Sequence, residues 1–273
     1  MNVCLNADVG ESFGPVRVGN DEALIPLISA ASIACGMHAG DPAMMIRTID
    51  IALQHGVAIG AHPGFNDIWG FGRRPITMKP QDIEYLVTYQ IGALQALAAT
   101  RQMKVGHVKP HGALNNMAHR NADVARAVAR GIKAADRDLV FFANCCSEMT
   151  KAGEAEGLQV AHEAYVDRPY DADGAMVSRF NDNAVITDPR VAAEHVLRMV
   201  SEQALFARDG TRIPTPIDTL CIHGDEPTAV KLAEATRQAL AVNGFRSGPI
   251  GEMRLAAPRA DSLASPEQPL DVG

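Results

Sequence analysis

Short apolar runs alternate with longer amphipathic stretches along almost the whole chain. The short runs contain many branched and small apolar residues and end among glycine, proline or aspartate, a pattern typical of buried strands. We expect seven strands, over residues 3–6, 29–34, 57–60, 104–109, 139–143, 159–163 and 219–223.

The longer stretches carry apolar residues three and four positions apart, which is the spacing of one helix face. We expect helices over residues 43–55, 81–100, 122–135, 189–206 and 228–242. The first has clear end signals, because Asp41 can cap its start, Pro42 suits its first turn and Gly56 can end it.

Strands and helices that alternate in this way form a parallel sheet with the helices outside it. About seven such units in one chain favour a single α/β barrel over two smaller domains. We therefore expect one α/β barrel domain over residues 1–255. Residues 256–273 have several prolines and little periodicity, and we expect a loosely ordered C-terminal tail there.

Composition narrows the classes of function. The formal net charge is −7 with no basic stripe, which argues against binding to nucleic acid or to an anionic membrane surface. The chain has no apolar span of about 18 residues and no charged leader, so a cytoplasmic protein is the simplest expectation. Five cysteines without CxxC spacing argue against a disulfide framework or a structural cysteine–zinc site.

Polar side chains gather where the predicted strands end. Four apolar runs lead into a histidine set among glycine, proline or aspartate: His38, His62, His111 and His223. In a barrel, strand ends that are far apart in sequence converge on one face, where active sites lie. The side chains that we expect there are Asn6, Asp8, Glu11, His38, Asp41, His62, Asp67, Arg73, Arg74, Lys109, His111, Glu163, Asp167, Arg168, His223 and Asp225. Such a pocket suits acid/base chemistry on a small, polar and anionic substrate.

Several of these residues also have a structural interpretation. Asp41 and Asp225 lie just before prolines that can begin helices, so both can serve as helix caps. Lys109 lies in an apolar run, where a buried ammonium needs a carboxylate or a substrate as partner. Glu163 can pair with Lys109 or with Arg168.

The arginines and the remaining histidines also have structural interpretations. Arg73 and Arg74 can hold an anion through paired donors, or form a solvated loop. We expect His107, His119 and His195 to be structural or exposed, because no comparable context surrounds them.

The sequence contains no motif that supports a bound metal or a bound nucleotide. Asp8, His38 and His62 could form a mixed nitrogen and oxygen metal site, but no HExxH motif is present and we predict no obligatory metal. The chain also lacks GxxxxGK[ST], so any ATP hydrolysis should depend on machinery elsewhere.

Six segments together closely resemble the LamB/YcsF family, the A subunits of bacterial ATP-dependent 5-oxoprolinase. They are NADVGESFG at 6–14, IACGMHAGDP at 33–42, GAHP with GFGRR at 60–63 and 70–74, VKPHGAL at 108–114, EAYVDR at 163–168 and IHGD at 222–225. The chain departs from the family pattern at Asn115, where tyrosine is usual, and at Cys145 and Cys146, in a segment commonly rich in serine.

The resemblance implies a seven-stranded variant of the α/β barrel, similar to the glycoside hydrolase/deacetylase superfamily. It also implies opening of 5-oxo-L-proline (pyroglutamate) to L-glutamate, coupled to ATP hydrolysis, in a complex with two other subunits. ATP would then be a co-substrate, handled with those partner subunits.

For such a reaction we expect Asp8 or Glu163 to act as base toward water, and His62 or His111 to protonate the leaving nitrogen. Lys109 would stabilise developing oxyanion charge, and Arg73 or Arg168 would hold the substrate carboxylate. The other expected substrate contacts are Asn6, Glu11, His38, Arg74, His223 and Asp225, with His38 and His223 mainly positioning their neighbours. Two alternatives remain open: a stand-alone metal-dependent deacetylase or amidohydrolase, and a non-catalytic subunit that binds substrate.

Overall fold

Seven parallel strands close into a barrel in the computed structural model, which describes residues 2–179, 181–252 and 255. Each barrel strand pairs in parallel with the next, and the last pairs with the first, with Asp8 opposite His223. The strands are β1 (Asn2–Val9), β2 (Ala30–Ala34), β3 (Ala58–His62), β4 (Val105–Val108), β5 (Val140–Asn144), β6 (Gln159–Tyr165) and β9 (Thr219–His223). The expected seven-stranded α/β barrel is therefore confirmed.

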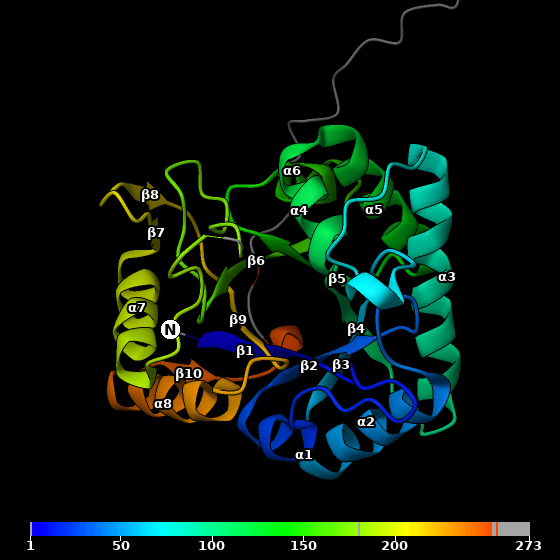
Figure 1. Cartoon of the computed structure of the whole chain (residues 1–273), viewed down its shortest axis with the longest axis horizontal. Coiled ribbons are helices and arrows are strands. Elements are labelled where there is room, and N and C mark those ends of the chain that lie inside the picture. Colours follow the sequence, from blue (N-terminus) through cyan, green and yellow to red (C-terminus); the bar gives the residue numbers. More distant parts are fainter. Residues whose placement is uncertain (1, 180, 253–254, 256–273) are drawn as a thin grey trace, which may run out of the picture.

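Helices surround the barrel on its outside (Figure 1). The five long ones are α2 (Pro42–His55), α3 (Pro80–Ala99), α5 (Ala122–Ala135), α7 (Pro189–Glu202) and α8 (Ala229–Val242). As expected, the Asp41 carboxylate accepts hydrogen bonds from the first N–H groups of α2, and Gly56 ends that helix with a φ of +64°. None of the described helices is long and apolar enough to cross a membrane.

Short elements complete the outer layer, and the sequence pattern did not reveal them. They are α1 (Asp21–Leu24), α4 (Gly112–Arg120), α6 (Glu148–Ala155), and the 3-10 turns η1 (Ile25–Leu27), η2 (Ile68–Gly70) and η3 (Ile250–Glu252). Elements of about two turns show too few periods for an amphipathic pattern to stand out.

The expected helix over residues 189–206 is too long. The helix α7 ends at Glu202, because Gln203 adopts a left-handed conformation with a φ of +46°. The next residues form β7 (Ala204–Phe206), which pairs antiparallel with β8 (Arg212–Pro214) outside the barrel. A further short strand, β10 (Arg246–Ser247), pairs with the start of β1. The expected tail over residues 256–273 lies outside the described residues.

Strand alternation divides the side chains into an outer and an inner set. On β1, the odd-numbered residues from Val3 to Val9 join the main core between barrel and helices. The even-numbered residues Cys4, Asn6 and Asp8 point inward. At the amino end of the barrel the inner side chains form a separate apolar cluster of Cys4, Ala30, Val140, Phe142 and Ala161 with Ile250. Toward the carboxyl ends the interior becomes polar, and this is where the candidate site lies.

Candidate active site at the carboxyl ends of the strands

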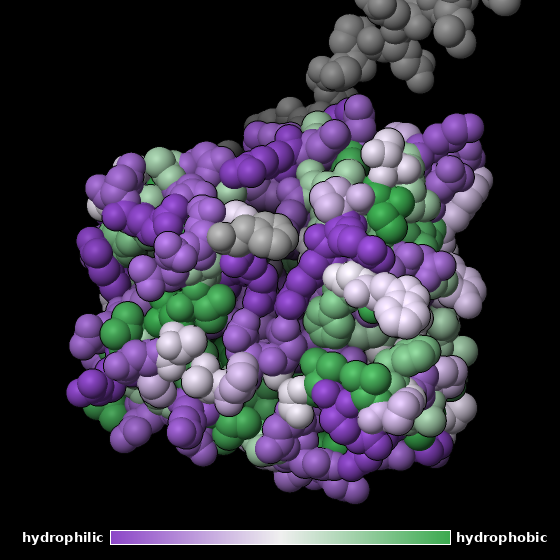
Figure 2. All heavy atoms as spheres, in the orientation of Figure 1, coloured by the Kyte–Doolittle hydropathy of each residue, from purple (hydrophilic) through white to green (hydrophobic). Residues whose placement is uncertain are grey.

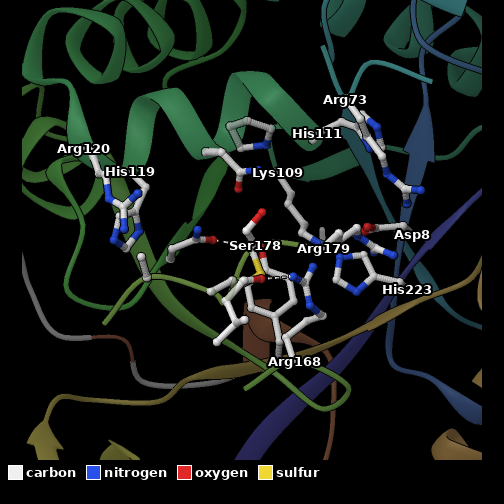
Figure 3. Close-up of a pocket in the computed structure, with 18 of the residues that line it drawn as sticks. Asp8, Arg73, Lys109, His111, His119, Arg120, Arg168, Ser178, Arg179 and His223 are labelled. Carbon is white, nitrogen blue, oxygen red and sulfur yellow. Dashed lines mark hydrogen bonds and ion pairs between the residues drawn. The ribbon is translucent and has the colours of Figure 1, made fainter. Parts of the chain in front are cut away.

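A cavity of about 490 Å³ opens at the carboxyl ends of the barrel strands. Hydrophilic side chains gather around the depression at the centre of the face shown in Figure 2. Seven of the predicted site residues line the cavity: Asp8, His62, Arg73, Lys109, His111, Arg168 and His223. In Figure 3, Asp8, His223 and Arg73 lie on one side of the cavity, and His119 and Arg120 lie on the other. The predicted convergence of strand ends therefore holds for these seven.

Lys109 follows β4 directly and supplies a buried ammonium at the cavity. Its Nζ lies 2.5 Å from Asp8 Oδ1 and 3.7 Å from Glu163 Oε1. This confirms the expected carboxylate partner. Burial disfavours the ammonium, but the charges of Asp8 and Glu163 outweigh burial and hold the pKa of Lys109 well above its ordinary value. Lys109 is thus held in its charged ammonium form beside the cavity.

The two carboxylates beside Lys109 differ in environment. Burial acts to raise the pKa of Asp8, yet His62 and Lys109 hold that pKa well below its ordinary value. Burial prevails at Glu163 and raises the pKa of that carboxyl despite the nearby ammonium. Glu163 accepts a hydrogen bond of 3.0 Å from Asn6 Nδ2, and neither residue lines the cavity. Asn6, expected to contact substrate, instead donates to Glu163, and Glu163 lies behind Lys109 rather than at the cavity surface.

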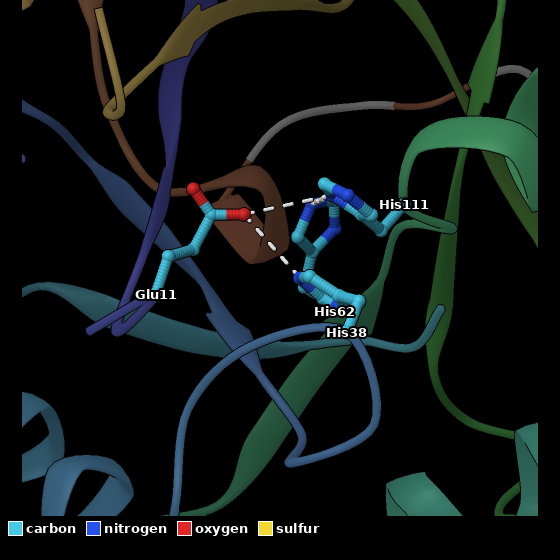
Figure 4. A group of neighbouring side chains, drawn as sticks. All are labelled: Glu11, His38, His62 and His111. Carbon is cyan, nitrogen blue, oxygen red and sulfur yellow. Dashed lines mark hydrogen bonds and ion pairs between the residues drawn. The ribbon is translucent and has the colours of Figure 1, made fainter. Parts of the chain in front are cut away.

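Three of the four strand-end histidines gather with one carboxylate, and we call Glu11, His38, His62 and His111 the histidine cluster (Figure 4). His38 stacks on His111 with ring centroids 3.6 Å apart, and its Nε2 lies 3.3 Å from Glu11 Oε1. His62 and His111 border the cavity, whereas His38 and Glu11 lie behind them. Burial holds the pKa of both His38 and His111 well below its ordinary value, so these imidazoles are neutral.

The fourth strand-end histidine, His223, forms a separate pair with Asp167. Its Nδ1 donates to an Asp167 oxygen 2.8 Å away, and Asp167 is fully buried. Burial acts to raise the pKa of Asp167, but His223 keeps that pKa below its ordinary value. A carboxylate at Nδ1 fixes the tautomer and orientation of a histidine, and it leaves Nε2 as the nitrogen available to the cavity. The pair therefore has the geometry of a general base, a role that the sequence did not assign to His223.

The predicted arginines have three different settings. Arg73 lines the cavity and donates from Nη2 to Asp225 Oδ2 at 2.7 Å. Arg168 also lines it, but its guanidinium is held by the carbonyl oxygens of Ala184 and Val177. It therefore fastens the loop between β6 and α7.

Arg74 lies away from the cavity, with an exposed guanidinium paired to Asp67. The expectation that Arg74 contacts substrate is therefore not supported by its position. Asp225 also differs from the expected cap, because α8 begins after Thr228 and the Asp225 carboxylate binds Arg73 instead.

Several residues that line the cavity were not predicted from the sequence. Arg179, in the irregular loop between β6 and α7, donates from Nη1 to Glu226 at 2.6 Å. Its Nη2 is buried and has no hydrogen-bond partner among the described residues. His119, expected to be structural or exposed, lines the cavity from α4 together with Arg120. No periodicity or strand-end position marks these residues, so no sequence signal pointed to them.

Comparisons with known proteins agree with this architecture. The model of the LamB/YcsF family matches residues 3–255. The chain is 48% identical over 250 residues to a protein of Nitrobacter hamburgensis whose name is that of the 5-oxoprolinase A subunit, covering 91% of this chain and 98% of that protein. A protein of the same name from Methylococcus capsulatus is 46% identical over 247 residues, covering 90% of this chain and 95% of that protein.

Solved structures show the same fold. A lactam utilization protein from Thermus thermophilus superposes with a TM-score of 0.85 at 42% identity, covering 91% of this chain and 99% of that one. The catalytic domain of a peptidoglycan N-acetylglucosamine deacetylase from Eubacterium rectale gives a TM-score of 0.50 at 12% identity, covering 94% and 92%. That second likeness concerns the barrel alone. The family match and the identity over nine-tenths of its length show that this chain belongs to the LamB/YcsF family.

Proposed function

We propose that this chain is the ring-opening subunit of an ATP-dependent 5-oxoprolinase, which converts 5-oxo-L-proline to L-glutamate together with two partner subunits. Relatives that share close to half of their residues with it over nine-tenths of its length carry the name of the 5-oxoprolinase A subunit. The word subunit in that name implies a complex. The name of the similar Thermus protein also refers to a lactam, the cyclic amide of the proposed substrate.

The observation that carries the proposal is the fixed charge at the cavity: the Lys109 ammonium, 2.5 Å from Asp8. Addition of water to the ring carbon places negative charge on the oxygen groups bound to that carbon, and a buried cation stabilises that charge far better than water does. The substrate also carries a carboxylate, and Arg73 and Arg179 border the same cavity. The free Nη2 of Arg179 is a donor suited to this group.

A lactam carbonyl is a poor electrophile, and this explains a need for ATP. Phosphorylation of the lactam oxygen by the partner subunits would make the ring carbon an easier target for water. The oxygen of one water then bonds to that carbon, and the carbon–nitrogen bond breaks with its electron pair moving to nitrogen. A second water releases inorganic phosphate from the resulting acyl phosphate and leaves glutamate.

The geometry favours His223 over Asp8 as the base toward water. Asp8 is held ionised by Lys109 and His62, so it is a weak base, and Glu163 does not line the cavity. His223 faces the cavity with its orienting partner Asp167 behind it. After taking a proton from water, His223 can deliver it to the leaving nitrogen, as a histidine does in acyl transfer.

Neither His62 nor His111 has an N–H directed at the cavity when neutral. The Nδ1 of His62 donates to the Lys109 carbonyl at 2.7 Å, and the Nε2 of His111 donates to the Phe71 carbonyl at 2.7 Å. The expected role of these two rings as proton donors to the leaving nitrogen is therefore not part of the proposal.

Reconstitution tests this function. The chain alone, the two partner subunits without it, and all three together are incubated with labelled 5-oxoproline and ATP, and glutamate and inorganic phosphate are measured. We expect glutamate only from the complete mixture. The proposal fails if the partner subunits form glutamate at the full rate without this chain, or if the chain alone forms glutamate without ATP.

A further inference from the structure

The histidine cluster brings four potential metal ligands together from four separate segments. Glu11 follows β1, His38 follows β2, His62 ends β3 and His111 precedes α4. One ligand atom from each lies within 4.8 Å of all the others, and all four side chains are buried. Figure 4 shows the Glu11 carboxylate facing the imidazole rings, which are also turned toward one another.

The hydrogen bonds at the back of two rings decide which nitrogens face the cluster. A backbone carbonyl only accepts, so His62 must carry its proton on Nδ1 toward Lys109 O, and His111 on Nε2 toward Phe71 O. In the neutral rings, the lone pairs of His62 Nε2 and His111 Nδ1 therefore point into the cluster. These two atoms are 3.0 Å apart, and Glu11 Oε1 lies 3.5 Å from His111 Nδ1. Acceptors face acceptors at hydrogen-bond distance, which is unfavourable unless a metal cation or a proton lies between them.

The surroundings hold these rings in place. A metal-bound histidine commonly donates its other N–H to a backbone carbonyl, as both His62 and His111 do. Gly72 lets the loop backbone approach closely, since a Cβ there would lie 2.6 Å from His38 Cβ and 2.8 Å from His111 Cδ2. The stacked His38 ring completes the packing. The lone pairs of His62 and His111 are thus oriented in advance. The His38 ring lies parallel to that of His111, with 3° between the planes, so it has to turn before its Nε2 can face the same ion.

The distances suit a small divalent ion. A tetrahedral zinc site with bonds of about 2.0–2.1 Å has neighbouring ligand atoms about 3.3–3.4 Å apart. Three of the separations, 3.0, 3.3 and 3.5 Å, bracket that value, and the others lie within 4.8 Å. Three imidazoles with one carboxylate favour zinc and its first-row neighbours over magnesium or calcium, which prefer oxygen ligands.

We propose that Glu11, His38, His62 and His111 bind one zinc or other first-row divalent ion. Four protein ligands make a closed site, so the ion ties together the segments after β1, β2, β3 and β4 beside the cavity. The sequence favoured no obligatory metal, because ligands scattered over a barrel look the same as a hydrogen-bonding network. The site goes beyond the proposed ring opening and does not depend on it.

Metal binding is measured on the full chain after removal of metals with a chelator. Zinc titrated by calorimetry should bind with about one equivalent per chain, and cobalt(II) should give the intense visible absorption of a tetrahedral site. Zinc should also raise the melting temperature by several degrees. Glu11→Gln and His111→Gln should each weaken zinc binding by about 100-fold or more.

The matched control is His162→Gln, which removes a histidine outside the cavity and should bind zinc as the unaltered chain does. To separate lost binding from poor folding, the melting curves of the Glu11 and His111 variants without metal are compared with that of the unaltered chain. The proposal is overturned if the unaltered chain binds neither zinc nor cobalt at about 0.1 mM metal, or if folded Glu11→Gln and His111→Gln both bind zinc unchanged.

Discussion

Two histidine–aspartate pairs lie at opposite ends of the same strand, β9. At its carboxyl end, His223 donates to Asp167 at 2.8 Å, and before its amino end Asp218 accepts from His162 at 3.0 Å. The distances are almost equal, but the settings are not. Asp167 is fully buried and His223 borders the cavity, whereas the Asp218 side chain is 20% exposed and lies away from the cavity. A histidine–carboxylate pair alone therefore does not define a site.

The two ends of the barrel interior also differ, because different kinds of side chain point inward at each end. Inward-pointing positions at the amino end carry Cys4, Phe142 and other apolar side chains, which fill the interior. The corresponding positions at the carboxyl end carry Asp8, Lys109 and His223 around a cavity. Because the alternation of each strand is unchanged along its length, residue type alone separates a packed end from a reactive one.

The largest expected effect concerns stability at the carboxyl end. Lys109→Met removes the cation shared by Asp8 and Glu163 and leaves two buried carboxylates without it. We expect the free energy of unfolding to fall by about 3–5 kcal/mol, measured by chemical denaturation. Lys133→Met, which removes a surface pair with Glu156, should cost less than about 1 kcal/mol. Equal losses would contradict the distinction between the buried and the exposed pair.

The two histidine–aspartate pairs should differ next most strongly in catalysis. Asp167→Asn should lower kcat of the reconstituted complex by about 10²- to 10³-fold, because His223 loses the carboxylate that fixes its tautomer. Asp218→Asn should leave kcat within about twofold, since His162 does not reach the cavity. Steady-state kinetics with matched complex assembly would test this, and similar kcat values for both variants would remove the basis for the comparison.

His107 lies in the interior between the two ends and should affect stability through pH. Burial lowers the pKa of His107 to about 3, whereas an unfolded chain binds the proton near its ordinary pKa of 6.5. The folded pKa is depressed, so stability is complete above about pH 6.5 and is lost as the pH falls below it. Between about pH 7 and pH 5 the unaltered chain should lose about 2 kcal/mol more unfolding free energy than His107→Gln. If the unfolding free energies of the two proteins changed equally with pH, the pKa of His107 would not be depressed in the folded chain.

The smallest expected effect is a difference in KM between variants of two arginines. Arg179→Gln should raise KM for 5-oxoproline about tenfold, because Arg179 lines the cavity and its Nη2 has no hydrogen-bond partner among the described residues. Arg74→Gln should leave KM unchanged, since the Arg74 guanidinium pairs with Asp67 away from the cavity. Titration of initial rates against 5-oxoproline measures both, and a larger effect at Arg74 would reassign the anion contact.

The sequence predicted the barrel well, because each buried strand and long helix carries its own local pattern. All seven barrel strands overlap the apolar runs from which they were predicted, and each run leads into polar residues. The error after Glu202 arose because Ala204, Leu205 and Phe206 continue the apolar pattern of α7, while Gln203 breaks the helix in the backbone. A left-handed conformation at a glutamine has no recognisable sequence signal.

Only part of the site could be predicted from the sequence. Residues at strand ends, such as Asp8, Lys109 and His223, could be grouped because the fold fixes where strands end. Which partner each selects depends on distances of a few ångströms that the sequence does not contain. Asp225 therefore looked like a helix cap and binds Arg73 instead, and Arg179 came from a loop whose path no pattern describes.

The most direct measurement of the central claim is glutamate formation by the complex that contains Asp8→Asn. Asp8 contacts both the Lys109 ammonium and His62, so its charge links the Lys109 ammonium to the histidine cluster. If the charged carboxyl end opens the ring, the variant should form glutamate about 100-fold more slowly or worse, while the chain stays folded and assembles with its partners. Glutamate formation within about twofold of the unaltered complex would contradict that claim.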